Sequence, residues 1–98
     1  MKYVKTQWFQ SAPDEPILFY EEIGDGKVIR FLEEFADGTF GFADAHQSRG
    51  GTWLPEETCP VEDNGETAEC KSEYVSQAEF EEKWGRAQDN VRVTDTAQ

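Results

Sequence analysis

The sequence predicts an α+β fold: an antiparallel meander sheet of about four strands, with one C-terminal helix packed on one face. Two Asp-Gly pairs, at residues 25–26 and 37–38, lie between runs of β-branched and aromatic residues, as is typical of tight hairpins. A capping motif at Ser76 opens an amphipathic segment further along the chain. The 98 residues suffice for a single domain, which we expect over residues 1–88, followed by a mobile C-terminal tail over residues 89–98.

The first half of the chain is expected to form the meander. Its strands are runs rich in β-branched and aromatic residues, at positions 3–9, 17–23, 28–35 and 39–42. Two-residue turns at both Asp-Gly pairs place Tyr20 opposite Phe31 and Phe35 opposite Phe40. These aromatic pairs favour that register.

In this register the two-residue period of a strand gathers aromatic side chains on one side of the sheet. That side carries Leu18, Tyr20, Ile29, Phe31, Phe35, Phe40 and Phe42. We expect it to be the core, covered by the helix. The opposite side is a mixed set of Phe19, Glu21, Ile23, Val28, Arg30, Leu32 and Glu34.

The helix has a well-marked start. Ser76 and Glu79 have the Ser-x-x-Glu spacing of a capping box. Phe80, Trp84 and Ala87 follow at the spacing that places them on one helical face. We expect this face to dock Phe80 and Trp84 onto the aromatic side of the sheet.

The two cysteines, Cys59 and Cys70, lie symmetrically around Asn64-Gly65, a preferred two-residue turn. A hairpin there would place the cysteines opposite each other, at a separation compatible with a disulfide. We expect a cytoplasmic location, because the first residues lack an apolar signal region and no run is long enough to span a bilayer. Cytoplasmic thiols are kept reduced, so the sequence leaves both states of the pair open.

No catalytic or metal-binding pattern stands out. His46 is the one histidine of the chain, and no nucleophile or carboxylate has a spacing that assigns it as a partner. One histidine and two cysteines fall short of a four-ligand zinc site, and the acidic residues 62–66 lack the ligand order of a calcium loop. We therefore expect no enzymatic activity, no metal and no cofactor.

The chain is strongly acidic, with 21 Asp and Glu against 9 Lys and Arg, a net charge of −12. Such a charge opposes binding to nucleic acid phosphates and anionic membranes, so the expected partner is a basic protein. The charge is uneven: residues 1–49 carry nine acidic and five basic residues (−4), and residues 50–98 carry twelve and four (−8). Crowded in one stretch are Glu56, Glu57, Glu62, Asp63, Glu66, Glu69 and Glu73.

These features predict a small acidic, non-enzymatic binding protein of the immunity or antitoxin type, which inhibits a basic toxin such as a nuclease. The acidic stretch would surround aromatic anchors, for which Trp8, Trp53 and Tyr74 are the candidates. The excess charge also fits a role in solubility alone.

Two further functions remain open. One is a small-molecule site on a loop formed by His46, Arg49, Gly50, Gly51 and Trp53, in which the glycines permit close backbone approach and the indole supplies a stacking face. The other is an acidic DNA mimic, which requires carboxylates spaced regularly over the folded surface.

Several segments together resemble a known family. They are Met-Lys-Tyr-Val-Lys at 1–5, Asp-Glu-Pro at 14–16, Glu-Glu-Phe-Ala-Asp-Gly at 33–38, Gly-Phe-Ala at 41–43, Gly-Gly-Thr-Trp-Leu at 50–54 and Val-Ser-Gln-Ala-Glu-Phe-Glu-Glu-Lys-Trp at 75–84. Over residues 1–87 the chain resembles a small, functionally uncharacterised bacterial family, a domain of unknown function. The resemblance implies a stand-alone domain and supplies no catalytic residues. The stretch around Cys59 and Cys70 departs from the acidic Pro-x-x-x-Glu-Ile segment of that family.

Overall fold

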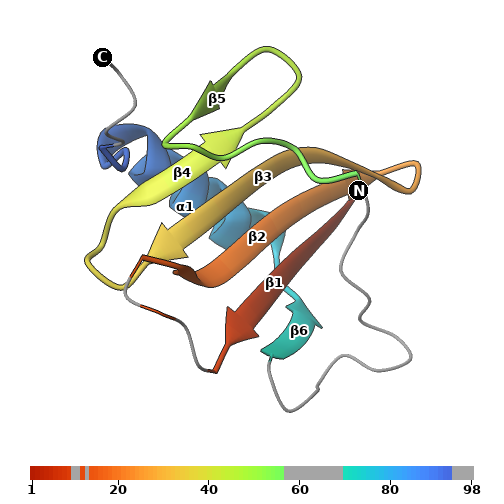
Figure 1. Cartoon of the computed structure of the whole chain (residues 1–98). Helices are drawn as coiled ribbons and strands as arrows, with labels where there is room; N and C mark the ends of the chain where they lie inside the picture. Colours follow the sequence, from red (N-terminus) through yellow and green to blue (C-terminus); the bar gives the residue numbers. More distant parts are fainter. Residues whose placement is uncertain (10–11, 13, 57–69, 94–98) are drawn as a thin grey trace.

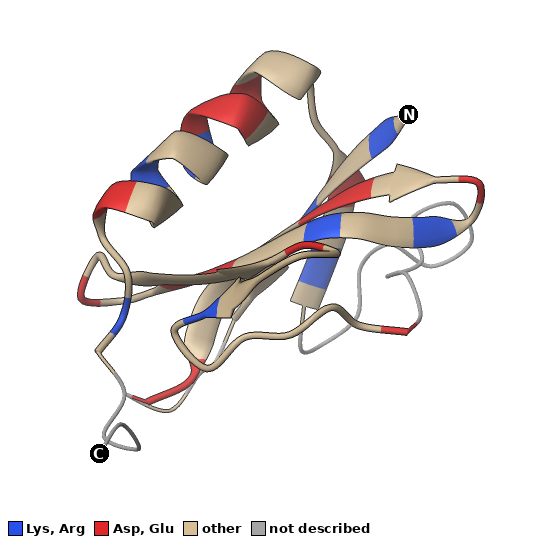
Figure 2. Ribbon diagram, turned by 90° about the horizontal axis from the view of Figure 1, so that it is seen from above, with Lys and Arg blue, Asp and Glu red and all other residues tan. Residues whose placement is uncertain are grey.

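The computed structural model describes residues 1–9, 12, 14–56 and 70–93, which form two layers. One layer is a six-stranded antiparallel sheet and the other is helix α1 (Gln77–Asp89), which lies on one side of it (Figure 1, Figure 2). The strands are β1 (Lys2–Trp8), β2 (Pro16–Gly24), β3 (Lys27–Phe35), β4 (Phe40–Ala43), β5 (Ser48–Arg49) and β6 (Cys70–Tyr74). Their order across the sheet is β5-β4-β3-β2-β1-β6.

The α+β class and the meander from β1 to β4 are confirmed, but the sheet is wider than the expected four strands. At one edge β5 adds two residues, with Ser48 opposite Ala43. At the other edge β6 pairs with β1, so that Ser72 lies opposite Thr6. Both added strands are short or polar edge strands, whose sequences show little apolar alternation.

The first hairpin, between β2 and β3, turns at residues 25–26 as predicted. Both residues have positive φ, 53° and 75°, which is the conformation that an Asp-Gly turn favours. Ile23 lies opposite Val28, which confirms the predicted register next to the turn. Beyond this pair the register shifts by one residue, because β3 carries an extra residue, Ile29, in a β-bulge.

The second hairpin uses a three-residue loop, 36–38, where a two-residue turn was expected. The amide of Gly38 donates to the carbonyl oxygen of Phe35 at 3.0 Å, and the amide of Phe35 donates to the carbonyl oxygen of Thr39 at 2.9 Å. Gly38 has a φ of 88°, the left-handed conformation that closes three-residue loops of this type. The predicted pairing of Phe35 with Phe40 is therefore wrong by one residue.

The register shift between β2 and β3 and the shift between β3 and β4 have opposite sign. Together they exchange the two faces of β3 and leave the faces of β2 and β4 as predicted. The predicted core residues of β2 and β4 remain on the helix side. In β3, however, Leu32 lies in the core, whereas Phe31 and Phe35 lie on the opposite face, contrary to prediction. A one-residue slip in register always has this effect, because successive side chains point to opposite faces.

The core lies between the sheet and α1. Its buried residues are Tyr3, Tyr20, Leu32, Phe40, Phe42, Phe80, Trp84 and Ala87. The helix begins as predicted, since Oγ of Ser76 accepts a hydrogen bond from the amide of Glu79 at 3.1 Å. The predicted docking of the aromatic helix face on the sheet is confirmed.

The chain after α1 is held against β4. The amide of Phe40 donates to the carbonyl oxygen of Asn90 at 2.8 Å, and the amide of Arg92 donates to the carbonyl oxygen of Phe40 at 2.6 Å. This part of the expected mobile tail is therefore anchored, and residues 94–98 lie outside the described residues.

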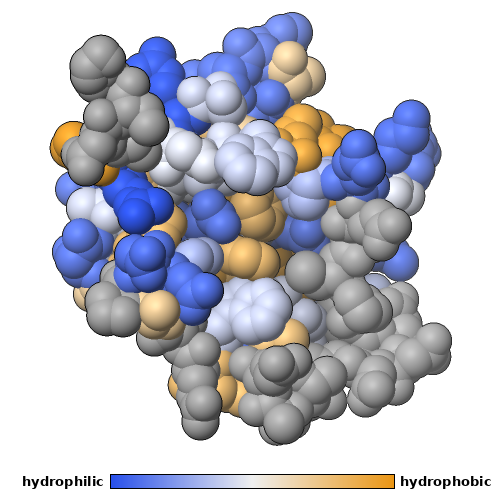
Figure 3. Space-filling view, in the orientation of Figure 1, coloured by the Kyte–Doolittle hydropathy of each residue, from blue (hydrophilic) through white to orange (hydrophobic). Residues whose placement is uncertain are grey.

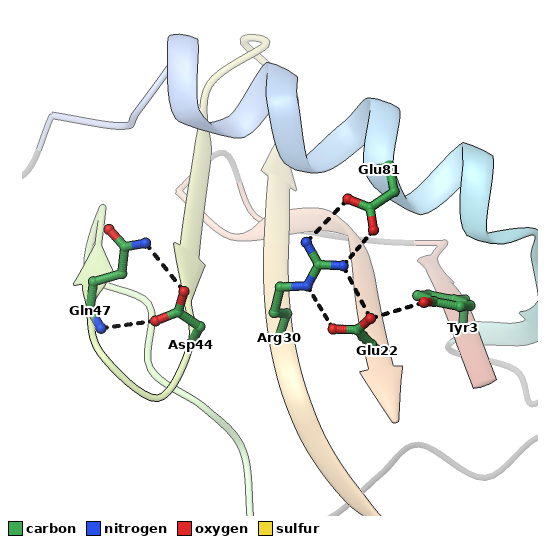
Figure 4. A network of polar contacts seen from close by, with 6 residues as sticks. All are labelled: Tyr3, Glu22, Arg30, Asp44, Gln47 and Glu81. Carbon is green, nitrogen blue, oxygen red and sulfur yellow. Dashed lines mark hydrogen bonds and ion pairs between the residues drawn. The ribbon is translucent and has the colours of Figure 1, made fainter. Parts of the chain in front are cut away.

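An ion-pair network joins the sheet to the helix (Figure 4). Arg30, in β3, donates from Nε to Oε1 of Glu22 at 2.6 Å and from Nη2 to Oε2 of Glu81 at 2.6 Å. The hydroxyl of Tyr3 donates to Oε2 of Glu22 at 2.9 Å. The network thus joins three strands and the helix through Glu22 and Arg30.

Aromatic rings of the helix cover the same guanidinium. Arg30 Cζ lies 4.8 Å from the ring centroid of Phe80 and 5.0 Å from that of Trp84, within the range of cation–π attraction. The hydrogen bonds from Arg30, and a weaker contribution from Tyr3, lower the pKa of Glu22 against the opposing effect of burial. The ionised carboxylate is therefore the form that the fold stabilises.

Arg30→Met is expected to lower the free energy of unfolding by about 2–4 kcal/mol, because it leaves Glu22 buried without its cationic partner. The matched control is Arg86→Met, which removes an exposed ion pair in which Nη2 of Arg86 lies 3.9 Å from Oε2 of Glu82. This control is expected to cost less than about 0.5 kcal/mol. Urea unfolding at neutral pH measures both losses. Equal losses would contradict the role assigned to the network.

The network also predicts a pH dependence of stability. Because the pKa of Glu22 is lowered in the folded state, its contribution is present above the unfolded-state pKa and is lost as the pH falls through the folded-state pKa. Glu22→Gln lacks this titration. The difference in unfolding free energy between wild type and Glu22→Gln is expected to shrink between about pH 7 and about pH 3. A difference that stays constant with pH would show that the ionised form is not favoured by folding.

Candidate functional site

The face of the sheet opposite α1 is partly covered by the chain that follows β5. In Figure 1 this segment, residues 50–56, crosses in front of the sheet, while α1 lies behind it. Thr52 is 3% exposed, and its Oγ1 donates to Oε1 of Glu33 at 2.6 Å. The segment is thereby anchored to the C-terminal part of β3.

Close backbone approach allows this anchoring. A Cβ atom at Gly41 would overlap Oγ1 of Thr52 and lie 3.2 Å from the carbonyl oxygen of Gly50. Gly50 has a φ of 70°, and a Cβ atom there would lie 2.8 Å from the Cα atom of Gly41. Glycine at both positions is required for the segment to lie on β4.

Between this segment and the sheet lies a cleft of about 380 Å³, which we call the sheet cleft. Its floor is formed by Phe19, Phe31 and Phe35 of β2 and β3, and Trp53 lines it from the covering segment. Trp53 is 74% exposed. Figure 3 shows this face, with apolar side chains at its centre and strongly hydrophilic side chains around them. The volume lies within the range of small-ligand sites in proteins.

Charged groups also line the sheet cleft. Asp14 and Glu15 are exposed and come from the connection before β2, Glu33 comes from the floor, and Arg92 comes from the chain after α1. Oε1 of Glu15 accepts a hydrogen bond from the amide of Ala12 at 2.8 Å, which orients that carboxylate. Acidic groups therefore outnumber basic ones at an otherwise aromatic cleft.

Two of these groups interact with the floor. Burial raises the pKa of Glu33, and the hydrogen bond from Thr52 and the charge of Arg92 partly offset this effect. Arg92 Cζ lies 4.3 Å from the ring centroid of Phe35, and Nη2 lies 3.5 Å from the carbonyl oxygen of Asp14. The sheet cleft thus holds one guanidinium against an aromatic ring.

The residues predicted for a ligand loop are separated by the fold. Gly51 and Trp53 line the sheet cleft. Gly50 packs against β4, and Arg49 is exposed in β5. Arg49 and His46 are not part of the cleft lining.

His46 lies in the turn between β4 and β5. Oδ1 of Asp44 accepts hydrogen bonds from the amides of His46 and Gln47 at 2.8 and 3.0 Å, and Figure 4 shows the contacts with Gln47. These hydrogen bonds lower the pKa of Asp44, and the bond from the amide of His46 has the largest effect. The turn is ordered by its own hydrogen bonds and leaves the imidazole of His46 exposed.

The predicted acidic stretch is described at its two ends, where Glu56 and Glu73 are both exposed. The other members of the stretch lie outside the described residues: Glu57, Glu62, Asp63, Glu66 and Glu69. Cys59 does as well, and so does most of the hairpin expected between Cys59 and Cys70. Cys70 itself opens β6, opposite Trp8.

The three predicted aromatic anchors differ in exposure. Trp8 is half-buried, with its ring centroid 5.3 Å from that of Phe19 in an edge-on contact. Tyr74 is 45% exposed on the edge strand β6, where Nζ of Lys2 lies 5.7 Å from its ring centroid. Of the three, Trp53 is the one that lines the sheet cleft.

Sequence reasoning missed the charged groups of the cleft, which are Asp14, Glu15, Glu33 and Arg92. Asp14 and Glu15 lie between the strands expected at 3–9 and 17–23, and Arg92 lies in the expected tail. A three-residue loop at 36–38 is compatible with the same Asp-Gly signal and would have placed Glu33 and Phe35 on the opposite face.

Within the ranges that the structure describes, no three His, Cys, Asp or Glu side chains gather closely enough to hold a metal ion. In the same ranges, no helix has the length and apolar character needed to cross a membrane.

Two Gly→Ala substitutions are expected to have opposite effects on stability. Gly41→Ala should lower the free energy of unfolding by about 1–3 kcal/mol, because the new methyl group displaces Thr52 and the segment that it anchors. Gly85→Ala, in α1, meets no atom within 4 Å and should raise it by up to about 1 kcal/mol through helix propensity. Thermal or urea unfolding measures both. A neutral Gly41→Ala would contradict the close packing of the segment on β4.

Comparison with known proteins places the chain in a family. Residues 2–89 match the family model described as domain of unknown function DUF6881. None of the curated proteins and none of the solved structures matches the chain. The resemblance to a domain of unknown function is thereby confirmed, and the chain belongs to the DUF6881 family.

Proposed function

We propose that this chain is a non-enzymatic binding protein that inhibits a basic protein, in the manner of immunity and antitoxin proteins that block toxins such as nucleases. The observation that carries this proposal is the exposure of Trp53 in a cleft that Asp14 and Glu15 also line. An indole that is 74% exposed leaves a large apolar surface in water. Aromatic residues within a polar rim are typical of the centres of protein interfaces.

The charge of the chain supports the same proposal. The net charge of −12 favours approach of a basic surface and speeds association with it. Among the described residues, Figure 2 shows acidic side-chain positions on the helix, on strands and in turns at the edges of the sheet. In this proposal the charge attracts the partner and the sheet cleft supplies the specific contact.

A small-molecule ligand is the second candidate. The volume of the sheet cleft, about 380 Å³, and its lining by Gly51 and Trp53 favour it. Such a ligand would contact Trp53 without depending on the net charge of the whole domain. Salt dependence therefore separates the two candidates.

Trp53→Ala tests the proposal. The tagged chain is used to isolate a partner from a lysate of the source organism, and the partner is then purified and titrated with wild type and variants. Trp53→Ala is expected to weaken binding by about tenfold or more, as truncation of an interface anchor does. The control Phe9→Ala removes an exposed aromatic side chain that does not line the sheet cleft, and it should change the affinity by less than about threefold.

Two further measurements complete this test. The affinity should fall as salt rises from about 50 mM to about 500 mM, and an equimolar amount of the chain should block the activity of the partner. An affinity that changes neither with salt concentration nor with Trp53→Ala would overturn the proposal. A small molecule that binds wild type but not Trp53→Ala, with no protein partner retained, would favour the second candidate.

A further inference from the structure

We infer that the sheet cleft binds an arginine side chain of the partner, with its guanidinium stacked on Trp53 and paired with Asp14 and Glu15. This inference rests on the proposed function and names the contact by which the partner is recognised. It follows from what the cleft already holds, from the charge at its rim and from the shape of its floor.

The cleft itself contains a guanidinium. Arg92 lies over the ring of Phe35 at 4.3 Å, with Nη2 directed at the carbonyl oxygen of Asp14, 3.5 Å away. An aromatic face below and an oxygen acceptor beside it are the two features by which proteins hold guanidinium groups. Trp53 supplies a second aromatic ring to the lining of the same cleft, and this residue is 74% exposed.

The carboxylates at the rim fit a second cation. Asp14 and Glu15 are adjacent and exposed, and the amide of Ala12 orients the Glu15 carboxylate through Oε1. A planar guanidinium can donate two parallel hydrogen bonds to a carboxylate while its face stays against a ring. An ammonium group has no flat face and no fork of donors, so lysine fits the same arrangement less well.

The floor fits the aliphatic part of the side chain. Phe19 and Phe31 lie edge to face, with ring centroids 5.1 Å apart, and they supply an apolar surface to the cleft that Trp53, Asp14 and Glu15 also line. The methylene stem of an arginine packs on such a surface while its charged end reaches the carboxylates. An apolar side chain would cover the floor but leave these carboxylates without a counter-charge.

The test uses a blocked glycyl-arginyl-glycine amide as the probe. The control peptide carries citrulline, which replaces the guanidinium with a neutral ureido group of the same shape. The signal is the indole N–H resonance of Trp53, assigned with Trp53→Phe, and the indole of Trp84 in the core serves as reference. The arginine peptide is expected to shift the Trp53 resonance saturably at millimolar concentration. The citrulline peptide should bind about tenfold more weakly or not at all.

Matched variants locate the charge contact. The double variant Asp14→Asn, Glu15→Gln should weaken binding of the arginine peptide by about fivefold or more, because it removes both rim carboxylates. Asp25→Asn removes one exposed carboxylate in the turn between β2 and β3, outside the cleft lining, and should leave the affinity unchanged. All of these side chains are exposed, and thermal unfolding confirms that each variant is folded. The absence of a saturable shift, equal binding of the citrulline peptide, or unchanged affinity in the double variant would each overturn the inference.

The same variants separate this inference from the proposed function. A basic partner whose binding depends on salt and Trp53 but is unaffected by the double variant would overturn the arginine contact and leave the proposed function standing. An arginine peptide that binds as expected, with only acidic or no protein partners, would support the cleft chemistry and overturn the proposed function.

Discussion

One extra residue in β3, Ile29, decides what each face of the sheet presents. Because side chains alternate along a strand, an inserted residue exchanges the faces of everything that follows it. Arg30 and Leu32 therefore lie under the helix, whereas Phe31 and Glu33 lie on the open face. The three-residue loop after β3 then restores the expected faces of β4. The core and the sheet cleft both follow from this bulge.

The bulge also places a charged residue beneath the helix, and the fold accommodates it. Arg30 is held by Glu22 and Glu81 and covered by aromatic rings, so its charge is matched within the structure. Arg92 repeats the guanidinium-on-ring contact on the other face, over Phe35. There the neighbouring carboxylates remain at the surface. The carboxylates near Arg30 are thus paired with it inside the fold, whereas carboxylates near Arg92 are accessible to solvent.

The features that the sequence predicts correctly depend on neighbours along the chain. An Asp-Gly pair favours a tight turn through the conformations of its own two residues. Ser76 caps the helix through the amide of Glu79, three residues away. The faces of β3 depend instead on a bulge and on a loop length, and the Asp-Gly pattern is compatible with more than one length. A pattern of alternation cannot contain that information.

The pairing of β6 with β1 and the sheet cleft are not predicted by the sequence, for a related reason. Lys71 and Glu73 make β6 look like a solvated connection, because an edge strand needs few apolar residues. Asp14, Glu33 and Arg92 come from three distant parts of the chain and meet only when the sheet is complete. Their proximity is a property of the tertiary fold, and composition and spacing carry no trace of it.

The ladder between β1 and β6 has a consequence for how the domain folds. The hydroxyls of Thr6 and Ser72 share a hydrogen bond of 2.8 Å across 66 positions of sequence, so forming this ladder closes a loop around the entire meander. Loop closure of that length carries an entropic cost that local hairpins do not. We therefore expect the hairpins to form before β6 docks. Since the amide of Val75 donates to the carbonyl oxygen of Tyr3 at 2.9 Å, docking of β6 on β1 also fixes the start of the segment that leads into α1.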